Sequence, residues 1–535
     1  MSPVLCLDPS AMRLDADGVA DFRWPLPLHE VIGFRDHLLR ELAMQLGALA
    51  RRGGMEADLL RIAAPGLLYR AMSLFEAASV ARAVAEQGAE VTLPASDVTL
   101  GPLLRGQEPR DFRFDPRSRL RQPFPVEPRL RSVMRCVRNR FSRAPLPRRS
   151  VWEVDTDRQI VCVTLERAAL HHAEVVSEPV VYCHPRDWLS VGPSWSASVQ
   201  QQGLAAEALD DTMNAVVKAA SVHGLIMPGQ ALRYLRGYLD ELTALARAHF
   251  ERLVARPNRL PGRLWVVSGV SPWARVLGLA VQQSGGSVTG HEHGTGESWS
   301  DACGDSLFEL DSLDRFVAYT PGSAAGLRQL RSTCPPGWPL RGEIEGLPAS
   351  GSVPARDRRR AKRDGKPRAL VVNTLYRGDL MRFKPPVADI VAADWQARLF
   401  GWLARSGYEP LFRPHPEDRV APPCGFAEVL GVKTLTGPLD AALSQVDVVI
   451  FDYPLTSAWR DALDSDLPMV LVDFGQCPVS PEARRLLDGR VAVVQACFDN
   501  ANRAQVDWDQ LGKALQRAPD LDDGQFYETF FGAHA

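Results

Sequence analysis

The sequence contains no long apolar run, no paired cysteines and almost no net charge. A span of about 18 apolar residues, which would predict a membrane-crossing helix, does not occur. The nine cysteines are scattered, with neither a Cys-x-x-Cys pair nor a disulfide framework, which favours a reducing compartment. Residues 1–15 lack a basic start and a long apolar stretch, so we expect no secretory signal there. These absences favour a cytoplasmic protein.

The balance of charge also bears on partners. Sixty-two Lys and Arg residues face 64 Asp and Glu residues, so no overall positive field attracts nucleic acid, and we expect no nucleic-acid partner. The hydrophobic fraction of 45% and the charged fraction of 24% are typical of a globular protein. A chain of 535 residues is long enough for two or three domains, each with its own core.

One segment departs from this balance. Residues 101–150 hold fourteen arginines and four acidic residues, a local net charge of +10, together with interleaved prolines and phenylalanines. The simpler interpretation is a solvated irregular segment, which this composition favours. The alternative is that the arginines at 105–149 contact an anionic membrane surface or a polyanionic acceptor, since each basic residue near anionic lipid contributes about 1 kcal/mol.

The order of expected elements indicates the fold class. A strand at 3–8 and helices at 28–51, 67–87 and 231–253 come first. From about residue 264 strands and helices alternate, which is typical of a doubly wound parallel sheet. The alternation stops at 348–367, a charged and Pro- and Gly-containing stretch that reads as a linker, and then resumes.

We therefore expect an α/β protein with two Rossmann-like, doubly wound domains. The N-terminal domain is expected at 1–347, with the Arg-rich segment 101–150 inside it, and the C-terminal domain at 368–535. Two such halves joined by a linker describe a GT-B-like architecture, in which donor and acceptor meet in a central cleft. Strand ends face that cleft, where ligands bind in open parallel sheets.

Polar residues follow two of the expected strands in the C-terminal half. Arg-Pro-His-Pro at 413–416 ends one strand, and Asp452 ends another, after which Thr456 and Ser457 open a helix. Free backbone N–H groups at a helix start favour anions, and a guanidinium and an imidazole would add donors. This pattern predicts a diphosphate or phosphodiester site, hence a nucleotide-linked donor. Plain helix capping and a loop shaped by prolines are the structural alternatives.

A second cluster lies at 291–299, with the sequence His-Glu-His-Gly-Thr-Gly-Glu-Ser-Trp after an expected strand. A histidine at a strand end before a glycine turn is placed to act as a general base, because a neutral imidazole accepts a proton near pH 7. His293 is the candidate base, and Glu292 and Glu297 are candidates to orient it. A histidine with a purely structural role is the alternative.

Together these segments resemble the CDP-glycerol glycerophosphotransferase family and, more broadly, capsule-polymer transferases with a His-Pro and a Ser-Ser motif. His293, Gly294 and Thr295 match the family's His-Gly-Thr, and residues 413–416 match its Arg-Pro-His-Pro-like segment. The third motif, Asp-Tyr-Ser-Ser followed by Asp, is matched with a two-residue insertion and one replacement by Asp452, Tyr453, Thr456, Ser457 and Asp461. The resemblance covers mainly residues 264–320 and 368–475.

The resemblance implies a transferase that moves a sugar or polyol phosphate from a nucleotide-activated donor, with CMP- or CDP-linked donors favoured. The acceptor would be a cell-surface polysaccharide, a teichoic-acid-like polymer or a lipid-linked acceptor, reached from the inner face of the membrane. His293 would be the base, with Gly294 and Thr295 in the acceptor loop. The donor would be held by Arg413, His415, Asp452, Thr456, Ser457 and Asp461.

We expect no metal and no cofactor, because no Asp-x-Asp clamp stands at a suitable strand end. Three alternatives remain. The first is a sugar-nucleotide epimerase on the same fold. The second is a metal-dependent hydrolase that uses His291 and His293, with His415 and Asp452 completing the shell. The third is a non-catalytic binding or assembly protein.

Overall fold

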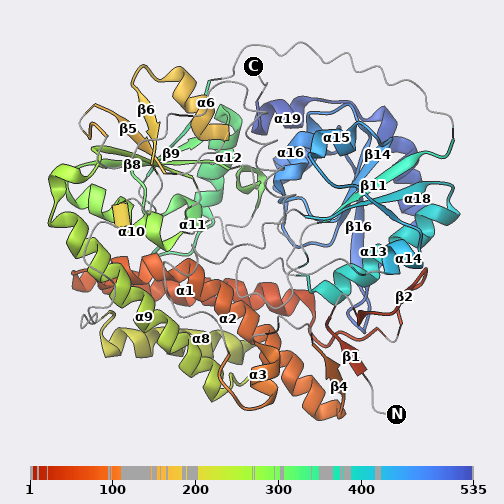
Figure 1. The fold of residues 1–535 in the computed structure, drawn as a ribbon, viewed down its shortest axis with the longest axis horizontal. Coiled ribbons are helices and arrows are strands. Elements are labelled where there is room, and N and C mark those ends of the chain that lie inside the picture. Colours follow the sequence, from red (N-terminus) through yellow and green to blue (C-terminus); the bar gives the residue numbers. More distant parts are fainter. Residues whose placement is uncertain are drawn as a thin grey trace.

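The computed structural model describes residues 4–8, 11–20, 22–93, 97, 99–109, 146, 154–156, 158–163, 167–183, 188–189, 203–267, 269, 271–293, 296–301, 307–338, 340, 342–348, 365–373, 376, 387–415, 423 and 425–532. Most of the Arg-rich segment and of the expected linker lies outside these ranges. Two sheets lie side by side with a layer of helices along one side of the molecule (Figure 1). The expected α/β class with parallel sheets is confirmed.

Seven strands form the C-terminal sheet: β11 (Arg368–Val372), β12 (Glu409–Arg413), β13 (Lys433–Thr434), β14 (Val448–Phe451), β15 (Met469–Asp473), β16 (Ala492–Phe498) and β17 (Ala504–Val506). They are hydrogen-bonded in the order β13-β12-β11-β14-β15-β16-β17. Every pair is parallel except β16 and β17. Strands β14 and β15 are buried throughout, as expected for apolar strands covered on both faces.

The strand order locates the place where ligands bind in such sheets. Strand β11 comes first in the chain, then β12 is added on one side and β14 on the other. This is the order of a doubly wound sheet, and the connections leave β11 and β14 in opposite directions. The helices of this half are α13 (Asp389–Arg405), α14 (Gly425–Glu428), α15 (Leu439–Leu443), α16 (Ser457–Leu463), α17 (Pro481–Leu487), α18 (Trp508–Arg517) and α19 (Gln525–Phe530).

A second sheet has six strands, all parallel: β5 (Ile160–Cys162), β6 (Val180–Tyr182), β7 (Arg263–Val266), β8 (Ser287–His291), β9 (Arg315–Ala318) and β10 (Glu343–Gly346). Its order, β6-β5-β7-β8-β9-β10, also reverses once, between β5 and β7. Strands β5, β6 and β10 are not predicted by the sequence. Each has only three or four residues, too few for a clear pattern. Helices α6 (Arg167–Val175), α10 (Pro272–Gln283), α11 (Leu307–Leu310) and α12 (Pro321–Ser332) connect these strands.

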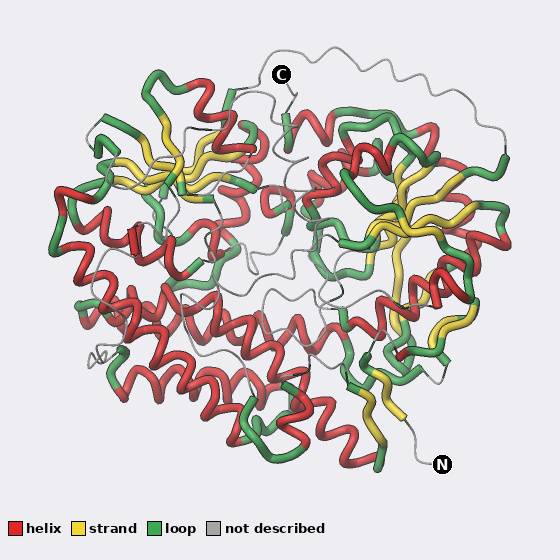
Figure 2. Tube along the Cα trace, viewed as in Figure 1, coloured by secondary structure: helices red, strands yellow, loops and turns green. Residues whose placement is uncertain are grey.

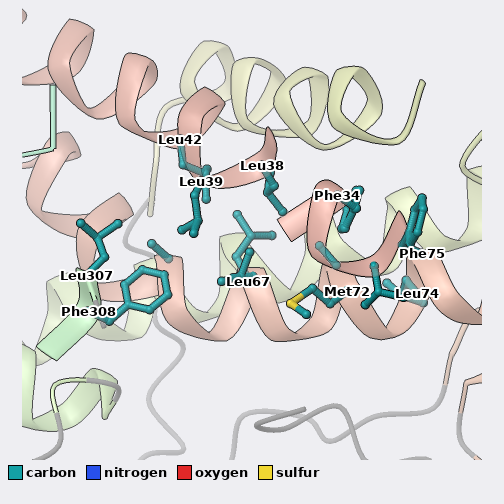
Figure 3. Close-up of a cluster of buried hydrophobic side chains, with 14 of the residues drawn as sticks. Phe34, Leu38, Leu39, Leu42, Leu67, Met72, Leu74, Phe75, Leu307 and Phe308 are labelled. Atoms are coloured by element: carbon teal, nitrogen blue, oxygen red, sulfur yellow. The ribbon is translucent and has the colours of Figure 1, made fainter. Parts of the chain in front are cut away.

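Long helices of the N-terminal half form the layer along one side of the molecule (Figure 2). They are α1 (Leu28–Arg52), α2 (Glu56–Gln87), α8 (Ala206–Val222) and α9 (Gly229–Val254). Phe34 of α1 stacks on Phe75 of α2 with ring centroids 4.3 Å apart. Figure 3 shows that Leu307 and Phe308 of α11 reach the same apolar cluster. The helical layer is therefore continuous with the core of the six-stranded sheet.

Two small sheets complete the N-terminal part. Strands β1 (Val4–Cys6) and β4 (Glu90–Thr92) pair in parallel, and β2 (Leu14–Asp15) forms a hairpin with β3 (Gly18–Val19). A short helix, α3 (Leu100–Leu104), packs on α2. None of the helices in the described part of the chain combines the length and hydropathy needed to cross a membrane.

The β2–β3 hairpin packs on the C-terminal half of the chain. It lies on α13 of the C-terminal half, where Asp394 is fully buried. The Asp394 carboxylate accepts hydrogen bonds from the Val19 N–H (2.9 Å), from Arg398 Nε (3.0 Å) and from Arg503 Nη2 (2.7 Å). Two guanidinium groups and a backbone donor satisfy the buried charge, which fixes the hairpin to the C-terminal sheet domain.

We predict that Asp394→Ala lowers the free energy of unfolding by about 3 kcal/mol, because removing one partner leaves two arginines partly buried without their counter-charge. Urea unfolding at neutral pH measures this. Lys513→Ala, which removes an exposed side chain of the same half, is the control and should change stability by less than about 0.5 kcal/mol. Equal midpoints for the two variants would contradict the role given to Asp394.

Candidate functional site

Arg413 and Asp452 lie at the same edge of the C-terminal sheet, on either side of β11. Val372, the last residue of β11, pairs with Arg413 on one side and with Phe451 on the other. Asp452 follows Phe451 directly. Because the strands are parallel, these residues share the carboxyl edge, next to the point where the strand order reverses.

Asp452 is buried and belongs to a hydrogen-bonded network beneath this edge. Gln396 Nε2 donates to Asp452 Oδ2 (3.3 Å) and to Asn373 Oδ1 (3.0 Å). The Tyr376 hydroxyl donates to Gln396 Oε1 (2.7 Å), and Gln476 Nε2 contacts the Asp452 carbonyl oxygen (3.4 Å). The amides and the hydroxyl hold the carboxylate at the strand end. No motif in the sequence identifies these partners, although a glutamine within an apolar helix face is a usable signal.

Arg413 reaches across the edge of the sheet rather than out to solvent. Its Nη2 donates to the Gly437 carbonyl oxygen at 2.6 Å. Partial burial lowers the pKa of Arg413, and the nearby Asp461 carboxylate raises it. Arg413 and Asp461, both candidates for donor binding, therefore interact electrostatically, and the carboxylate offsets part of the positive charge of the guanidinium.

The remaining candidates of the C-terminal half flank Arg413 and Asp452. His415 is half-buried, two residues beyond the end of β12. Thr456 caps α16, with its Oγ accepting from the Ala458 N–H at 3.4 Å, and Ser457 is the first residue of that helix. Helix α16 has seven residues, so its dipole is smaller than that of a long helix.

In the N-terminal sheet, His293 lies just beyond β8 with one quarter of its side chain exposed. Its Nδ1 is 3.9 Å from Oε2 of Glu309, a residue that the sequence analysis did not single out. Burial raises the pKa of Glu297 to about 7, and His293 lowers it in part, so these two groups also interact. The structure therefore brings His293, Glu297 and Glu309 together. Gly294 and Thr295 lie outside the described residues.

Glu292 points elsewhere. Its carboxylate is almost fully buried and accepts from the Tyr319 N–H (3.0 Å) and the Ser323 hydroxyl (3.2 Å). Burial raises the pKa of Glu292, while these hydrogen bonds and the charge of Arg460 lower it. Arg460, from α16, lies over the Tyr319 ring, with its Cζ atom 4.3 Å from the ring centroid. Glu292 thus belongs to the packing between the two halves of the chain.

His291 is fully buried and faces a different set of groups from His293. Its Nε2 is 2.9 Å from His172 Nδ1, and its Nδ1 is 3.3 Å from the Val266 carbonyl oxygen. Burial lowers the pKa of His291 to about 3 and that of His172 to about 4. Both are neutral at pH 7. Within the described ranges, no group of three or more His, Cys, Asp or Glu side chains is arranged to hold a metal ion.

The carboxyl edges of the two sheets meet at the loop after β8. Gly296 adopts φ +89°, and a Cβ atom there would lie 2.6 Å from the Leu455 side chain, just beyond β14. The 3-10 turn η4 (Glu297–Trp299) continues this contact. Its Trp299 is 6.4 Å, centroid to centroid, from Trp459 of α16, with nearly parallel rings. The His293 loop and the Asp452 loop are therefore neighbours.

Comparison with known proteins assigns no family. No family model matches the sequence, and no curated protein matches it significantly. The class of the protein is therefore defined by its fold, an α/β chain with one parallel and one mainly parallel sheet whose carboxyl edges lie against each other.

Glu297 should make stability depend on pH. The pKa of Glu297 in the folded state is raised from 4.5 to about 7. Its favourable contribution to the free energy of unfolding is therefore complete below pH 4.5 and is lost as the pH rises towards 7. In Glu297→Gln the side chain does not ionise, so the variant does not lose this stability as the pH rises. We expect the variant to gain stability relative to the wild type between pH 5 and 8, by about 1 to 3 kcal/mol because the side chain is only half-buried.

Urea unfolding at pH 5, 6, 7 and 8 measures the effect. Glu343→Gln, at an exposed position of β10, is the matched control and should show a pH-independent difference. The prediction is wrong if the Glu297→Gln difference is also the same at every pH.

Proposed function

We propose that the protein is a cytoplasmic GT-B-like transferase. It would move a sugar or polyol phosphate from a nucleotide-activated donor, with CMP- or CDP-linked donors favoured, to a cell-surface polysaccharide or teichoic-acid-like acceptor. One observation supports this most strongly. Arg413 and Asp452 flank the strand-order reversal of the C-terminal sheet, and the loop that carries His293 packs against the loop that follows Asp452. Donor and acceptor groups would then meet between the two edges.

The donor phosphates would be held by positive charge and backbone donors. Arg413 supplies a partly buried guanidinium, His415 lies two residues further on, and α16 begins with backbone N–H groups at Ser457. Negative charge grows on the nucleotide phosphate as the bond to the transferred group breaks. Fixed donors that face this charge stabilise the transition state more than the ground state. Asp452 and Asp461 would orient the site through the Gln396 network and through Arg413.

The acceptor hydroxyl would be activated by His293. The oxygen of the acceptor hydroxyl forms the new bond to phosphorus or to the anomeric carbon, and the hydroxyl proton passes to the imidazole. The nucleotide leaves with the electron pair of the broken bond. Holding both substrates between two packed edges reduces the entropic part of the barrier. The positive charge of residues 101–150 would favour a polyanionic acceptor or the inner face of an anionic membrane.

A thermal-shift screen against CMP, CDP, UDP, GDP and zinc tests the proposal. A nucleotide at 100 times its dissociation constant stabilises the folded state by about 2.7 kcal/mol, which is measurable as a higher melting temperature. We expect a cytidine nucleotide to stabilise the wild type. His415→Ala should lose this stabilisation, and His29→Ala, which removes an exposed histidine on α1, should keep it.

The other outcomes separate the alternatives. Stabilisation by UDP alone would favour a different sugar donor or the epimerase. A response to zinc alone would favour the metal-dependent hydrolase. No response to any nucleotide would contradict the transferase and leave a binding or assembly protein.

A further inference from the structure

Glu309 is a carboxylate inside the N-terminal sheet domain that no motif in the sequence identifies. It lies on the four-residue helix α11, between β8 and β9, and is 7% exposed. Its Oε2 accepts a hydrogen bond from the Gly269 N–H at 2.8 Å. A buried acidic side chain needs such a partner, because an unpaired carboxylate in the interior is strongly destabilising.

The backbone around Glu309 is held from two sides. A Cβ at Gly269 would collide with the Phe308 carbonyl oxygen and come within 2.9 Å of the Glu309 Cα, so glycine allows the β7 and β8 connections to approach this closely. Buried Arg275 donates to the Phe308 carbonyl oxygen (2.7 Å) and pairs with Asp311 (2.8 Å). The carboxylate of Glu309 is therefore fixed relative to the ends of β7 and β8.

His293 is the histidine that this carboxylate faces. The distance from Glu309 Oε2 to His293 Nδ1 is 3.9 Å, too long for a hydrogen bond but within electrostatic reach. Such pairs are often long before substrate binds and shorten in the reactive complex. Glu309 is nearly buried, whereas His293 is one-quarter exposed, so the pair runs from the interior of the domain towards solvent.

We propose that Glu309 positions His293 as a general base by holding the proton on Nδ1, which leaves Nε2 to take the proton of the acceptor hydroxyl. A carboxylate next to one ring nitrogen fixes the tautomer and the ring orientation, and it stabilises the imidazolium that forms. This role rests on the proposed transferase. Glu309 does not touch the reacting atoms and is a positioning residue.

Other acidic groups near His293 are arranged differently. Glu297, on η4, interacts with His293 and with Glu309, and its pKa near 7 makes it largely neutral when the solution is mildly acidic. Glu292, the neighbour of His293 in the chain, accepts hydrogen bonds from Tyr319 and Ser323, and the positive charge of Arg460 favours its ionised form. Glu309, in contrast, is nearly buried and has a carboxylate oxygen 3.9 Å from Nδ1 of His293.

Nitrogen-15 NMR of the histidine rings tests the proposal without any substrate. The His293 signals are assigned by their loss in His293→Asn. We expect the neutral imidazole of the wild type to carry its proton on Nδ1. In Glu309→Gln the Nε2-protonated form should appear, and the titration midpoint of His293 should move about 0.5 to 1 pH unit lower, because a nearby negative charge is lost.

Two further variants keep the test decisive. Glu309→Asp retains the charge and should restore much of the wild-type tautomer, while Glu343→Gln, an exposed carboxylate on β10, should leave His293 unchanged. An Nε2-protonated ring in the wild type, or identical His293 spectra in wild type and Glu309→Gln, would overturn the proposal. The wild-type spectrum decides alone if Glu309→Gln does not fold.

The measurement also separates this inference from the function on which it rests. The NMR result depends only on the contact between Glu309 and His293, whereas the nucleotide screen depends on the C-terminal sheet. With a transferase assay in hand, we expect Glu309→Gln to lower kcat by about 10- to 100-fold and to move the acidic limb of the pH–rate profile. A loss of kcat with an unmoved acidic limb would show a structural role instead and would contradict the proposal.

Discussion

The contact between the carboxyl edges of the two sheets is the constraint on which the rest of the arrangement depends. In a parallel sheet every strand ends at the same carboxyl edge, so polar residues that follow the strands lie together along that edge. The loop after β8 is then fixed to the other half by main-chain contacts. The Asp301 N–H donates to the Pro478 carbonyl oxygen (2.8 Å), and the Ser480 N–H donates to that of Trp299 (2.9 Å). A short antiparallel bridge between Ser300 and Val479 lies between them.

Other contacts between the two halves hold them in this same relative position. The C-terminal helix α19 returns to the N-terminal sheet domain, where the Phe530 carbonyl oxygen accepts from the Ser323 hydroxyl (2.9 Å). At the other end of the chain, the β2–β3 hairpin is bonded to Asp394. The β2–β3 hairpin and helix α19 therefore each pack on the opposite half. Because independent contacts restrain the two halves, the distance between the His293 loop and the Asp452 loop does not rely on one interaction alone.

The sequence predicts the regular part of this fold well and its connections poorly. Strands β12 and β14 end where the sequence predicts, at Arg413 and just before Asp452, because buried apolar runs mark them clearly. The two shortest strands of the N-terminal sheet were missed, since three residues carry almost no periodicity. The attachment of the β2–β3 hairpin and of Trp24 to the C-terminal half is also not predicted by the sequence. It depends on an ion-pair network between residues far apart in sequence, which local patterns do not reveal.

The three consecutive residues after Gly290 show the same limit at the scale of the site. In the sequence, His293 is the candidate base, Glu292 a candidate to orient it, and His291 a metal ligand only in the hydrolase alternative. Nothing in the sequence shows which groups surround each of the three side chains. His291 turns inward to His172, Glu292 turns to Tyr319 and Ser323, and His293 faces Glu309. The environments differ because each is supplied by a different element, α6, α12 and α11. A sequence motif can therefore indicate where polar chemistry gathers, but only the packing of distant elements determines which residue is placed to transfer a proton.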